Sequence, residues 1–477
     1  MLFNSFDFGV FLIIVYLLYW AIGVNKRVFQ NVLLLAASYF FYGLWDWRFL
    51  ILIIVSSLID FYAGKAITNS SKKGAKKLYL WISILWNLGV LFTFKYFNFF
   101  IQNFTDLFGL DVPETGYHFI NVIIPVGLSF YTFQTMSYTI DVYRERSKAT
   151  NNLLEFLCFV SFFPQLVAGP IERARSLLCQ FEKKRIFNFQ NTKEGLRQIL
   201  WGLFKKIVVA DNVAVVVNTY FDAPQDYGSL TMLYASTLFF FQIYCDFSGY
   251  SDVAIGTAKL FGFNLSKNFN IPYLAKTVSD YWQRWHITLT RWFTDYVYGP
   301  IVKNTNRSYT MKTVALFITM MLIGLWHGAN WTFVLFGLIQ AVFIAMERIQ
   351  WKRNGKTFTL AKGLNKAPFI VNFIYTSAII IGSGIFFRSR DLDHALLVYE
   401  RIFSFSASPE FSLVIGYKVC IVLILMATEI VTRFKNYPLF EFEKHINRPI
   451  RWGIYYVFIF IIFRYAGPTE QFIYFQF

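Results

Sequence analysis

The sequence has little charge. Charged residues make up only 15% of its 477 residues, whereas an ordinary soluble domain has about a quarter. Hydrophobic residues account for 56%, and the mean hydropathy is +0.44. Many windows of about 18 or more residues carry no charge at all, which is long enough for a helix to cross a bilayer. The composition therefore excludes an ordinary soluble domain and favours a membrane protein with many crossings.

Cysteine is also scarce and scattered, with four residues at Cys158, Cys179, Cys245 and Cys420. They form no CxxC pair and no Cys/His spacing, so neither a disulfide framework nor a metal site is expected. The sequence also lacks a P-loop, a dinucleotide-binding glycine fingerprint and an HExxH motif. These absences leave no standard motif for nucleotide hydrolysis or zinc-dependent proteolysis.

The charge that is present is mostly positive, with a net charge of +17. The basic residues are interspersed with apolar segments rather than gathered in a groove-like patch, so nucleic acid is not an expected partner. Lys72, Lys73, Lys76 and Lys77 follow the third apolar segment, whereas residues 101–118 contain no lysine or arginine. Because cytoplasmic loops are enriched in Lys and Arg, this alternation predicts an extracytoplasmic N-terminus.

The apolar segments predict an all-α bundle of about 11 transmembrane helices, with additional re-entrant helices, in one membrane domain covering residues 1–477. The first segment lacks a basic region before it and is interpreted as a retained span, not a signal peptide. Residues 153–168 lead into a Pro- and Gly-containing stretch, which predicts a re-entrant or broken helix. Residues 244–252 contain two acids, two serines and a glycine, which predicts a helix break that lines a cavity. Residues 276–300 predict one amphipathic polar helix.

Two of the five histidines lie in otherwise apolar, tryptophan-containing sequence. His286 ends the stretch 279–286, and His327 lies within Gly-Leu-Trp-His-Gly-Ala-Asn-Trp at 324–331. An ionisable side chain at membrane depth usually faces a polar cavity or path. A neutral imidazole can take a proton from a hydroxyl nucleophile, as acyl transfer requires. His327 could instead form a hydrogen bond that holds two helices together, and His286 could be an exposed residue at the membrane interface.

Three other groups of polar residues have more than one interpretation. Asp246 and Ser248 could belong to a Ser-His-Asp triad, but the sequence has no Gly-x-Ser-x-Gly elbow. Arg284 and Arg291 are two helical turns apart, so a single polar helix would present both to donor phosphates. The hydroxyl-rich stretch 129–138 could bond between helices or hydrate a tunnel.

Taken in order, these stretches resemble the membrane-bound O-acyltransferase superfamily, in particular its bacterial alginate O-acetyltransferase branch. The resemblance covers essentially the whole chain and runs through residues 1–5, 130–134, 163–172, 246–252, 285–286, 325–331 and 472–477. It implies a helical bundle around a central funnel or tunnel. In this resemblance His327 matches the catalytic histidine of the family, and His286 matches the second histidine of the bacterial branch.

The resemblance also implies transfer of an acyl group from a cytoplasmic donor to an extracytoplasmic polymer, often with an esterase-like partner protein. The expected activity is O-acetyl transfer from acetyl-CoA to a polysaccharide or cell-wall hydroxyl, in a bacterial inner membrane and with no bound cofactor. Candidates to line the substrate path are Arg284, Arg291, Asp246, Ser248, Asn330 and Trp326.

Two departures from the branch leave the histidine chemistry intact but weaken the case for alginate as the acceptor. Gln283 stands where many relatives have arginine, and residues 300–304 lack a Gly-Gly pair that many relatives carry. Three alternatives stay open at this point. They are transfer of D-alanine from a carrier protein, a lipid or sterol acyltransferase, and a non-enzymatic lipid or polysaccharide transporter.

Overall fold

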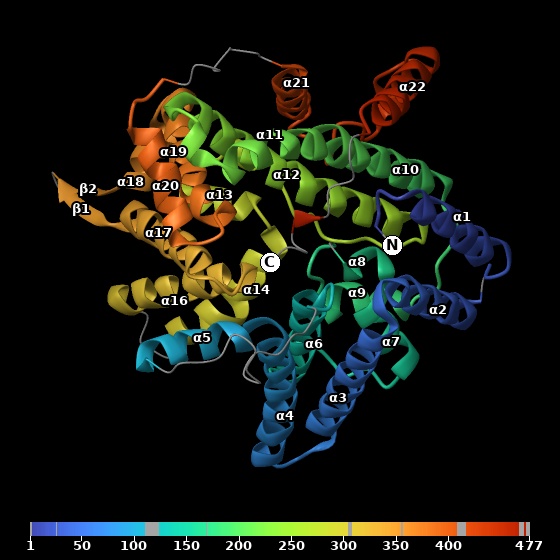
Figure 1. Cartoon of the computed structure of the whole chain (residues 1–477). Helices are drawn as coiled ribbons and strands as arrows, with labels where there is room; N and C mark the ends of the chain where they lie inside the picture. The colour runs from blue at the N-terminus through green and yellow to red at the C-terminus, as the bar shows by residue number, and fades with distance from the viewer. Residues whose placement is uncertain are drawn as a thin grey trace. The chain divides into compact units, whose positions relative to one another are not determined.

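The computed structural model describes residues 2–24, 26–109, 124–167, 169–303, 308–353, 356–407, 416–466 and 472–473. Almost all of its regular structure is α-helical, which confirms the predicted all-α class (Figure 1). Short 3₁₀- and π-helical segments accompany the α-helices, and the described residues also include a short antiparallel hairpin. Its strands are β1 (Gln350–Arg353) and β2 (Lys356–Thr359), with Gln350 opposite Thr359.

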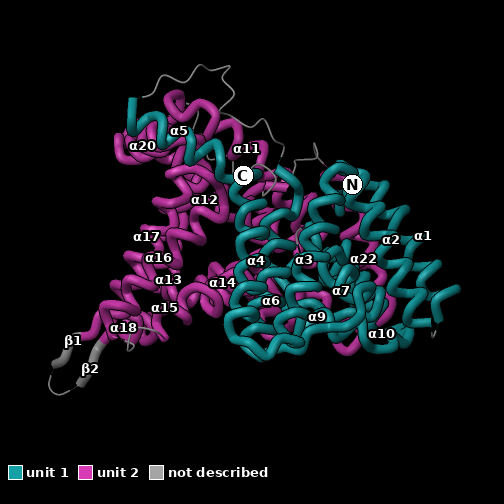
Figure 2. The backbone as a smooth tube through the Cα atoms, turned by 90° about the horizontal axis from the view of Figure 1, so that it is seen from below, with its two compact units in different colours: residues 1–199, 253–266 teal, residues 200–252, 267–477 magenta. Residues whose placement is uncertain are grey.

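The chain folds into two compact units (Figure 2). The first comprises residues 1–199 and 253–266, and the second residues 200–252 and 267–477. The prediction of a single membrane domain stays a prediction. The helices of the first unit are α1 (Phe6–Ala21), α2 (Arg27–Asp46), α3 (Leu50–Asn69), α4 (Lys73–Leu91), α5 (Phe97–Phe108), α6 (Leu128–Tyr143), α7 (Leu153–Ser161), α8 (Phe163–Leu166) and α9 (Ala174–Phe181).

Two helices, α10 (Phe189–Leu203) and α12 (Ser229–Leu260), contribute residues to both units. The remaining helices belong to the second unit. They are α11 (Asp211–Asp222), α13 (Val278–Arg284), α14 (Ile287–Phe293), α15 (Gly299–Lys303), α16 (Tyr309–His327), α17 (Trp331–Arg348), α18 (Leu360–Lys366), α19 (Phe369–Arg388), α20 (Leu392–Phe403), α21 (Tyr417–Val431) and α22 (Arg448–Arg464).

Five helical segments among the described residues are long and apolar enough to cross a membrane, so the protein is a multi-pass membrane protein. They are Arg27–Asn69, Lys73–Phe108, Tyr309–His327, Trp331–Arg348 and Phe369–Arg388. Two shorter apolar helical segments, Phe6–Ala21 and Leu153–Leu166, accompany them. The figure of about 11 crossings stays a prediction.

In the first unit α3, α4 and α6 pack against one another. The hydroxyl-rich face of α6 bonds across this interface: the Thr139 hydroxyl donates to Asp60 at 3.0 Å, and the Thr135 hydroxyl donates to Asn87 at 3.0 Å. The Thr135 bond confirms the interhelical interpretation for the stretch 129–138, and Thr139 follows directly after that stretch. The predicted break in 153–168 is also confirmed, because α7 ends at Ser161 and α8 begins at Phe163.

The basic cluster after the third apolar segment is mostly helical. Residues 70–72 form the connection between α3 and α4, and Lys73, Lys76 and Lys77 already lie in the first turns of α4. Similarly, residues 101–108 of the predicted loop 101–118 belong to α5. The rest of that predicted loop lies outside the described residues, apart from Gly109.

In the second unit the predicted helix break at residues 244–252 is wrong, since α12 runs without interruption for 32 residues. The glycine there serves close packing. A Cβ atom on Gly249 would lie 2.8 Å from the Gly202 carbonyl oxygen and 3.0 Å from the Lys206 backbone nitrogen. The polar residues around it bond to neighbouring segments instead of interrupting the helix.

The helices α16 and α17 form a tight hairpin that carries His327 at its bend. A Cβ atom at Gly324 would collide with the Phe333 carbonyl oxygen, and one at Gly337 with the Met320 carbonyl oxygen. Asn330 caps α17 by accepting the Thr332 N–H at 2.9 Å. The hairpin therefore depends on glycine at the crossing and a polar cap at the bend.

Candidate functional site

His327 is the last residue of α16 and is 2% exposed. Its imidazole ring centroid lies 5.0 Å from that of Trp326 and 5.0 Å from that of Phe387 on α19. Phe336 on α17 is the third ring around it, at 6.4 Å. Aromatic packing at the end of a helix thus fixes the position of this imidazole.

His286 occupies a left-handed backbone conformation, with φ 39° and ψ 53°, between α13 and α14. This conformation is uncommon for a residue with a side chain and is found disproportionately at functional sites. Two backbone hydrogen bonds hold it in place. The Ile287 N–H donates to the Asn268 carbonyl, and the Asn270 N–H donates to the Arg284 carbonyl, both at 2.9 Å.

The side chain of Asn268 sets the tautomer of His286. The backbone N–H of Thr288 donates to Asn268 Oδ1 at 3.2 Å, which identifies that atom as the amide oxygen. His286 Nδ1 lies 3.2 Å from the same oxygen, so Nδ1 carries the hydrogen and donates it. The lone pair of the neutral ring is then on Nε2, the atom that can accept a proton or a hydrogen bond.

The helix before His286 is fastened to α17 by two buried side chains. Glu347 accepts the N–H groups of Val278 and Ser279 at 2.6 and 3.0 Å, which caps the start of α13. Gln340 accepts the indole N–H of Trp282 at 3.1 Å. Both Glu347 and Gln340 are completely buried. The His286 segment is therefore braced against the same helical hairpin that carries His327.

Trp326 contacts both histidines. Its ring centroid is 5.6 Å from that of His286 and 5.0 Å from that of His327. The structure thus brings together two imidazoles that are 41 residues apart in the sequence, with one buried indole in contact with both. Of the residues predicted from sequence, His286, His327 and Trp326 form one cluster.

The electrostatic state of His286 follows from its burial. The side chain is fully buried and lies outside the membrane-spanning segments. Burial lowers the pKa of His286 to about 3, because the charged imidazolium loses its hydration. The ring is therefore neutral at physiological pH, the form that can accept a proton.

The predicted single polar helix over 276–300 is wrong, because Trp285 and His286 separate α13 from α14. Arg284 and Arg291 consequently do not share one helix face. Arg284 forms an ion pair with Asp280 at 2.8 Å, and Arg291 is exposed in the last turn of α14. Their role toward donor phosphates stays a prediction.

Asp246 and Ser248 belong to a buried charge network on α12. Lys206 pairs with both Asp246 and Asp211 at 2.7 Å, and Asp246 also accepts the Ile473 N–H at 2.8 Å. Lys205 donates to Ser248 at 3.0 Å. Asn330, as the cap of α17, also donates to the Arg390 carbonyl. The contacts of these three predicted path residues are those of helix packing and capping, and their contribution to a substrate path stays a prediction.

Sequence reasoning missed Asn268, Glu347 and Glu429. Glu429 on α21 is 5% exposed and accepts hydrogen bonds from the hydroxyls of Tyr244 and Tyr273 at 2.8 to 3.0 Å. A signal existed for Asn268, since residues 264–270 hold three asparagines in a short polar stretch between apolar segments. Isolated acids in apolar helices were the corresponding signal for Glu347 and Glu429.

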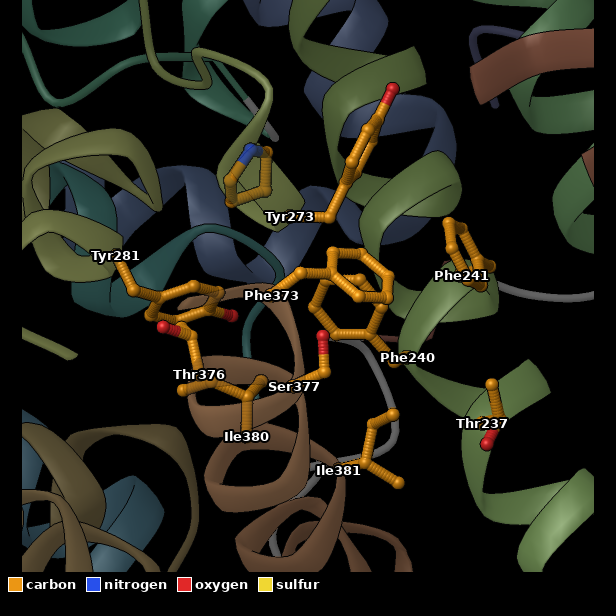
Figure 3. Close-up of a pocket in the computed structure, with 11 residues that line it drawn as sticks. Thr237, Phe240, Phe241, Tyr273, Tyr281, Phe373, Thr376, Ser377, Ile380 and Ile381 are labelled. Atoms are coloured by element: carbon orange, nitrogen blue, oxygen red, sulfur yellow. The ribbon is translucent and has the colours of Figure 1, made fainter. Parts of the chain in front are cut away.

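A cavity of about 110 Å³ is lined in part by Tyr281 of α13, the helix that precedes His286 (Figure 3). It is lined mainly by rings and aliphatic side chains from α12, α13 and α19, including Phe240, Tyr281 and Ile380. Tyr281 stacks on Trp285 at 5.6 Å, directly before His286. Neither histidine lines this cavity, so it is distinct from the histidine cluster, whose ring and hydrogen-bond geometry identifies the candidate site.

Comparison with known proteins identifies the family of the chain. The family model described as MBOAT, membrane-bound O-acyltransferase family, matches residues 34–388. The chain is 36% identical over 414 residues to probable alginate O-acetylase AlgI of Pseudomonas aeruginosa, covering 85% of this chain and 75% of that protein. It is 32% identical over 403 residues to the peptidoglycan O-acetyltransferase of Helicobacter pylori, covering 79% and 74%. Teichoic acid D-alanyltransferase of Bacillus subtilis is 28% identical over 268 residues, covering 52% and 65%.

Proposed function

Because the chain belongs to the membrane-bound O-acyltransferase family, we propose that it is an O-acetyltransferase using cytoplasmic acetyl-CoA. The acceptor is a hydroxyl of an extracytoplasmic polysaccharide or cell-wall polymer, reached directly or through an esterase-like partner protein. The relatives named as O-acetylases or O-acetyltransferases match about four-fifths of the chain, whereas the D-alanyltransferase of Bacillus subtilis matches about half. This difference favours acetyl over D-alanyl transfer.

The observation that carries the proposal is the pair of buried imidazoles in contact with Trp326. In acetyl transfer the acceptor oxygen attacks the thioester carbonyl, a C–O bond forms, and the C–S bond breaks. The hydroxyl proton passes to a base and then to the departing sulfur. We assign His327 as that base, and His286 Nε2 as a hydrogen-bond acceptor that lines the path and orients a reacting hydroxyl.

The test is the acetate content of the cell envelope in a strain whose only copy of the chain is wild type or a variant. Mild alkali releases ester-linked acetate and D-alanine together, so one hydrolysate distinguishes the two acyl groups. We expect acetate to depend on the chain and His327→Ala to reduce it below a tenth of wild type at equal expression. His394→Ala is the matched control, because His394 is buried and bonds the Phe221 carbonyl on α11. Loss of D-alanine with unchanged acetate would overturn the choice of acyl group.

We propose that the protein resides in the bacterial inner membrane with its N-terminus outside. The support is the uneven distribution of basic residues. Residues 72–77 contain four lysines, whereas residues 101–118 contain no lysine or arginine, and cytoplasmic segments are enriched in both. In a background without Cys179 and Cys420, an impermeant thiol reagent applied outside should label Thr105→Cys and not Ser71→Cys. The reverse pattern would invert the orientation and place donor and acceptor on the opposite sides.

A further inference from the structure

A second polar cluster lies in the first unit, where α3, α4 and α6 meet. Asp60 is near the middle of α3, and Ser83 is near the middle of α4. Asn87, Thr135 and Thr139 complete the cluster from α4 and α6. All five side chains are at most 1% exposed. An ionisable residue at this depth of a membrane-spanning helix is costly, and it is a functional-site candidate by default.

The hydrogen bonds surround the Asp60 carboxylate with donors. Its Oδ1 atom accepts the hydroxyls of Ser83 and Thr139, and its Oδ2 atom accepts Asn87 Nδ2 at 2.8 Å. The identity of that nitrogen is secure, because it also donates to the Ser83 carbonyl at 2.9 Å. Three donors directed at one carboxylate stabilise its charged form. The Asn87 N–H occupies Oδ2, whereas the two hydroxyls at Oδ1 can either donate to a charged carboxylate or accept from a neutral one.

This carboxylate has no cationic side-chain partner in the described part of the chain. The contrast with the second unit is direct, because there Lys206 compensates the buried carboxylates of Asp246 and Asp211. An uncompensated charge in such an environment is strongly destabilising. An ionised Asp60 would therefore need a positive charge beside it, whereas a neutral Asp60 would need none.

The chemistry of the cluster limits what that charge can be. The potential ligands are hard oxygens: two from Asp60, one hydroxyl each from Ser83, Thr135 and Thr139, and the amide oxygen of Asn87. One carboxylate neutralises one unit of positive charge, so a divalent ion would leave an excess charge in the apolar bundle. The side chains are already within hydrogen-bond distance of one another, so a small ion displaces them least.

We propose that Asp60, Ser83, Asn87, Thr135 and Thr139 form a binding site for a sodium ion that holds α3, α4 and α6 together. The ion would replace the hydrogen bonds inside the cluster with oxygen–metal contacts and neutralise the carboxylate. The site does not depend on the proposed acyl transfer, because it lies in the first unit and its residues belong to no part of the histidine cluster.

The experiment is thermal unfolding of the purified full-length protein in detergent, at constant ionic strength, with choline chloride replaced stepwise by NaCl, LiCl or KCl. A site that binds only the folded state should raise the unfolding midpoint in a saturable way with sodium, and less with potassium. Asp60→Asn keeps the shape and removes the charge, so its midpoint should not respond to sodium. Ser83→Ala removes one ligand and should raise the half-saturating sodium concentration about tenfold.

The matched control is Ser57→Ala, because Ser57 is equally buried on α3 but bonds only the Ile53 carbonyl. It should keep the sodium response of the wild type. If Asp60→Asn does not fold, the sodium dependence of the unfolding midpoint can still be compared between Ser83→Ala and Ser57→Ala. The proposal is overturned if the wild type shows no difference between sodium and choline, or if Ser83→Ala and Ser57→Ala respond alike. A midpoint that depends on pH but not on sodium would identify a protonated carboxyl instead and would also overturn it.

Discussion

His286 and His327 contact the same tryptophan but are held by different means. Hydrogen bonds hold His286: Asn268 fixes its tautomer, and a left-handed backbone conformation aims its ring. Packing holds His327: it ends a helix and is surrounded by rings. The hydrogen bond to Asn268 fixes which ring nitrogen of His286 carries the hydrogen. Ring packing fixes where the His327 imidazole lies but not which of its nitrogens is protonated. Loss of the packing around His327 should therefore lower the stability of the fold, whereas loss of the hydrogen bond to His286 should lower the catalytic rate.

The largest effect should come from the packing that supports His327. Gly337→Ala places a Cβ atom against the Met320 carbonyl oxygen at the crossing of α16 and α17. The atom in the way belongs to the backbone and cannot rotate aside. We therefore expect the variant to lose about 3 kcal/mol of stability, near the upper end of the range for overpacked cores. The control is Gly384→Ala on α19, where a Cβ atom meets nothing within 4 Å. Thermal unfolding in detergent measures both, and equal midpoints would refute the role of this crossing.

The next effect should come from the hydrogen bond that supports His286. Asn268→Leu removes the acceptor of Nδ1–H and releases the tautomer. We expect kcat to fall about 100-fold, within the range of general acid–base catalysis, with the KM for acetyl-CoA unchanged. Asn268→Asp retains an acceptor oxygen and should recover part of the rate. Asn270→Ala, which alters a neighbouring side chain bonded to Lys267, serves as the control. A rise in KM without a fall in kcat would contradict the positioning role.

The pH dependence of stability should distinguish a neutral buried His286 from an exposed one. Burial lowers the pKa of His286 to about 3, below the ordinary 6.5. The unfolded chain then binds a proton below about pH 6.5 and the folded chain does not, so stability is complete above pH 6.5 and falls as the pH drops. At pH 5 the loss should be about 2 kcal/mol relative to pH 7.5. His286→Gln should lose this part of the pH dependence, and an unchanged profile would show that His286 titrates normally.

The smallest effect should come from the brace between α13 and α17. Glu347→Gln leaves one oxygen where two accepted the N–H groups of Val278 and Ser279. We expect a destabilisation of about 1 kcal/mol and a rate loss of a few-fold. Glu400→Gln on the exposed face of α20 is the control and should change neither value. If both variants behave like wild type, the brace does not position the His286 segment.

The sequence predicted both histidines because an imidazole beside tryptophan in apolar sequence is visible without any structure. It did not predict that Asn268 orients His286, because the two are 18 residues apart and lie on segments that meet through backbone pairing. The same limit applies to Glu347, which caps a helix that begins 69 residues earlier in the chain. Contacts made across the fold leave no local periodicity in the sequence.

Two predictions about helices failed for local reasons. A glycine flanked by acids and serines was interpreted as a break in α12, but Gly249 permits close packing and the acids pair with lysines of another segment. A polar stretch was interpreted as one helix, but His286 adopts a left-handed conformation that is stabilised by hydrogen bonds donated to Asn268. In both cases a tertiary contact overrode the local pattern.

The central claim is that His286 and His327 act in one site around Trp326. Residues that act as a unit lose activity non-additively, so a double-mutant cycle tests the claim most directly. We would measure acetyl transfer by His286→Ala, His327→Ala and the double variant at equal expression. The account predicts that the double variant loses no more activity than the worse single variant. Multiplied losses would contradict it and would place the two histidines in independent roles.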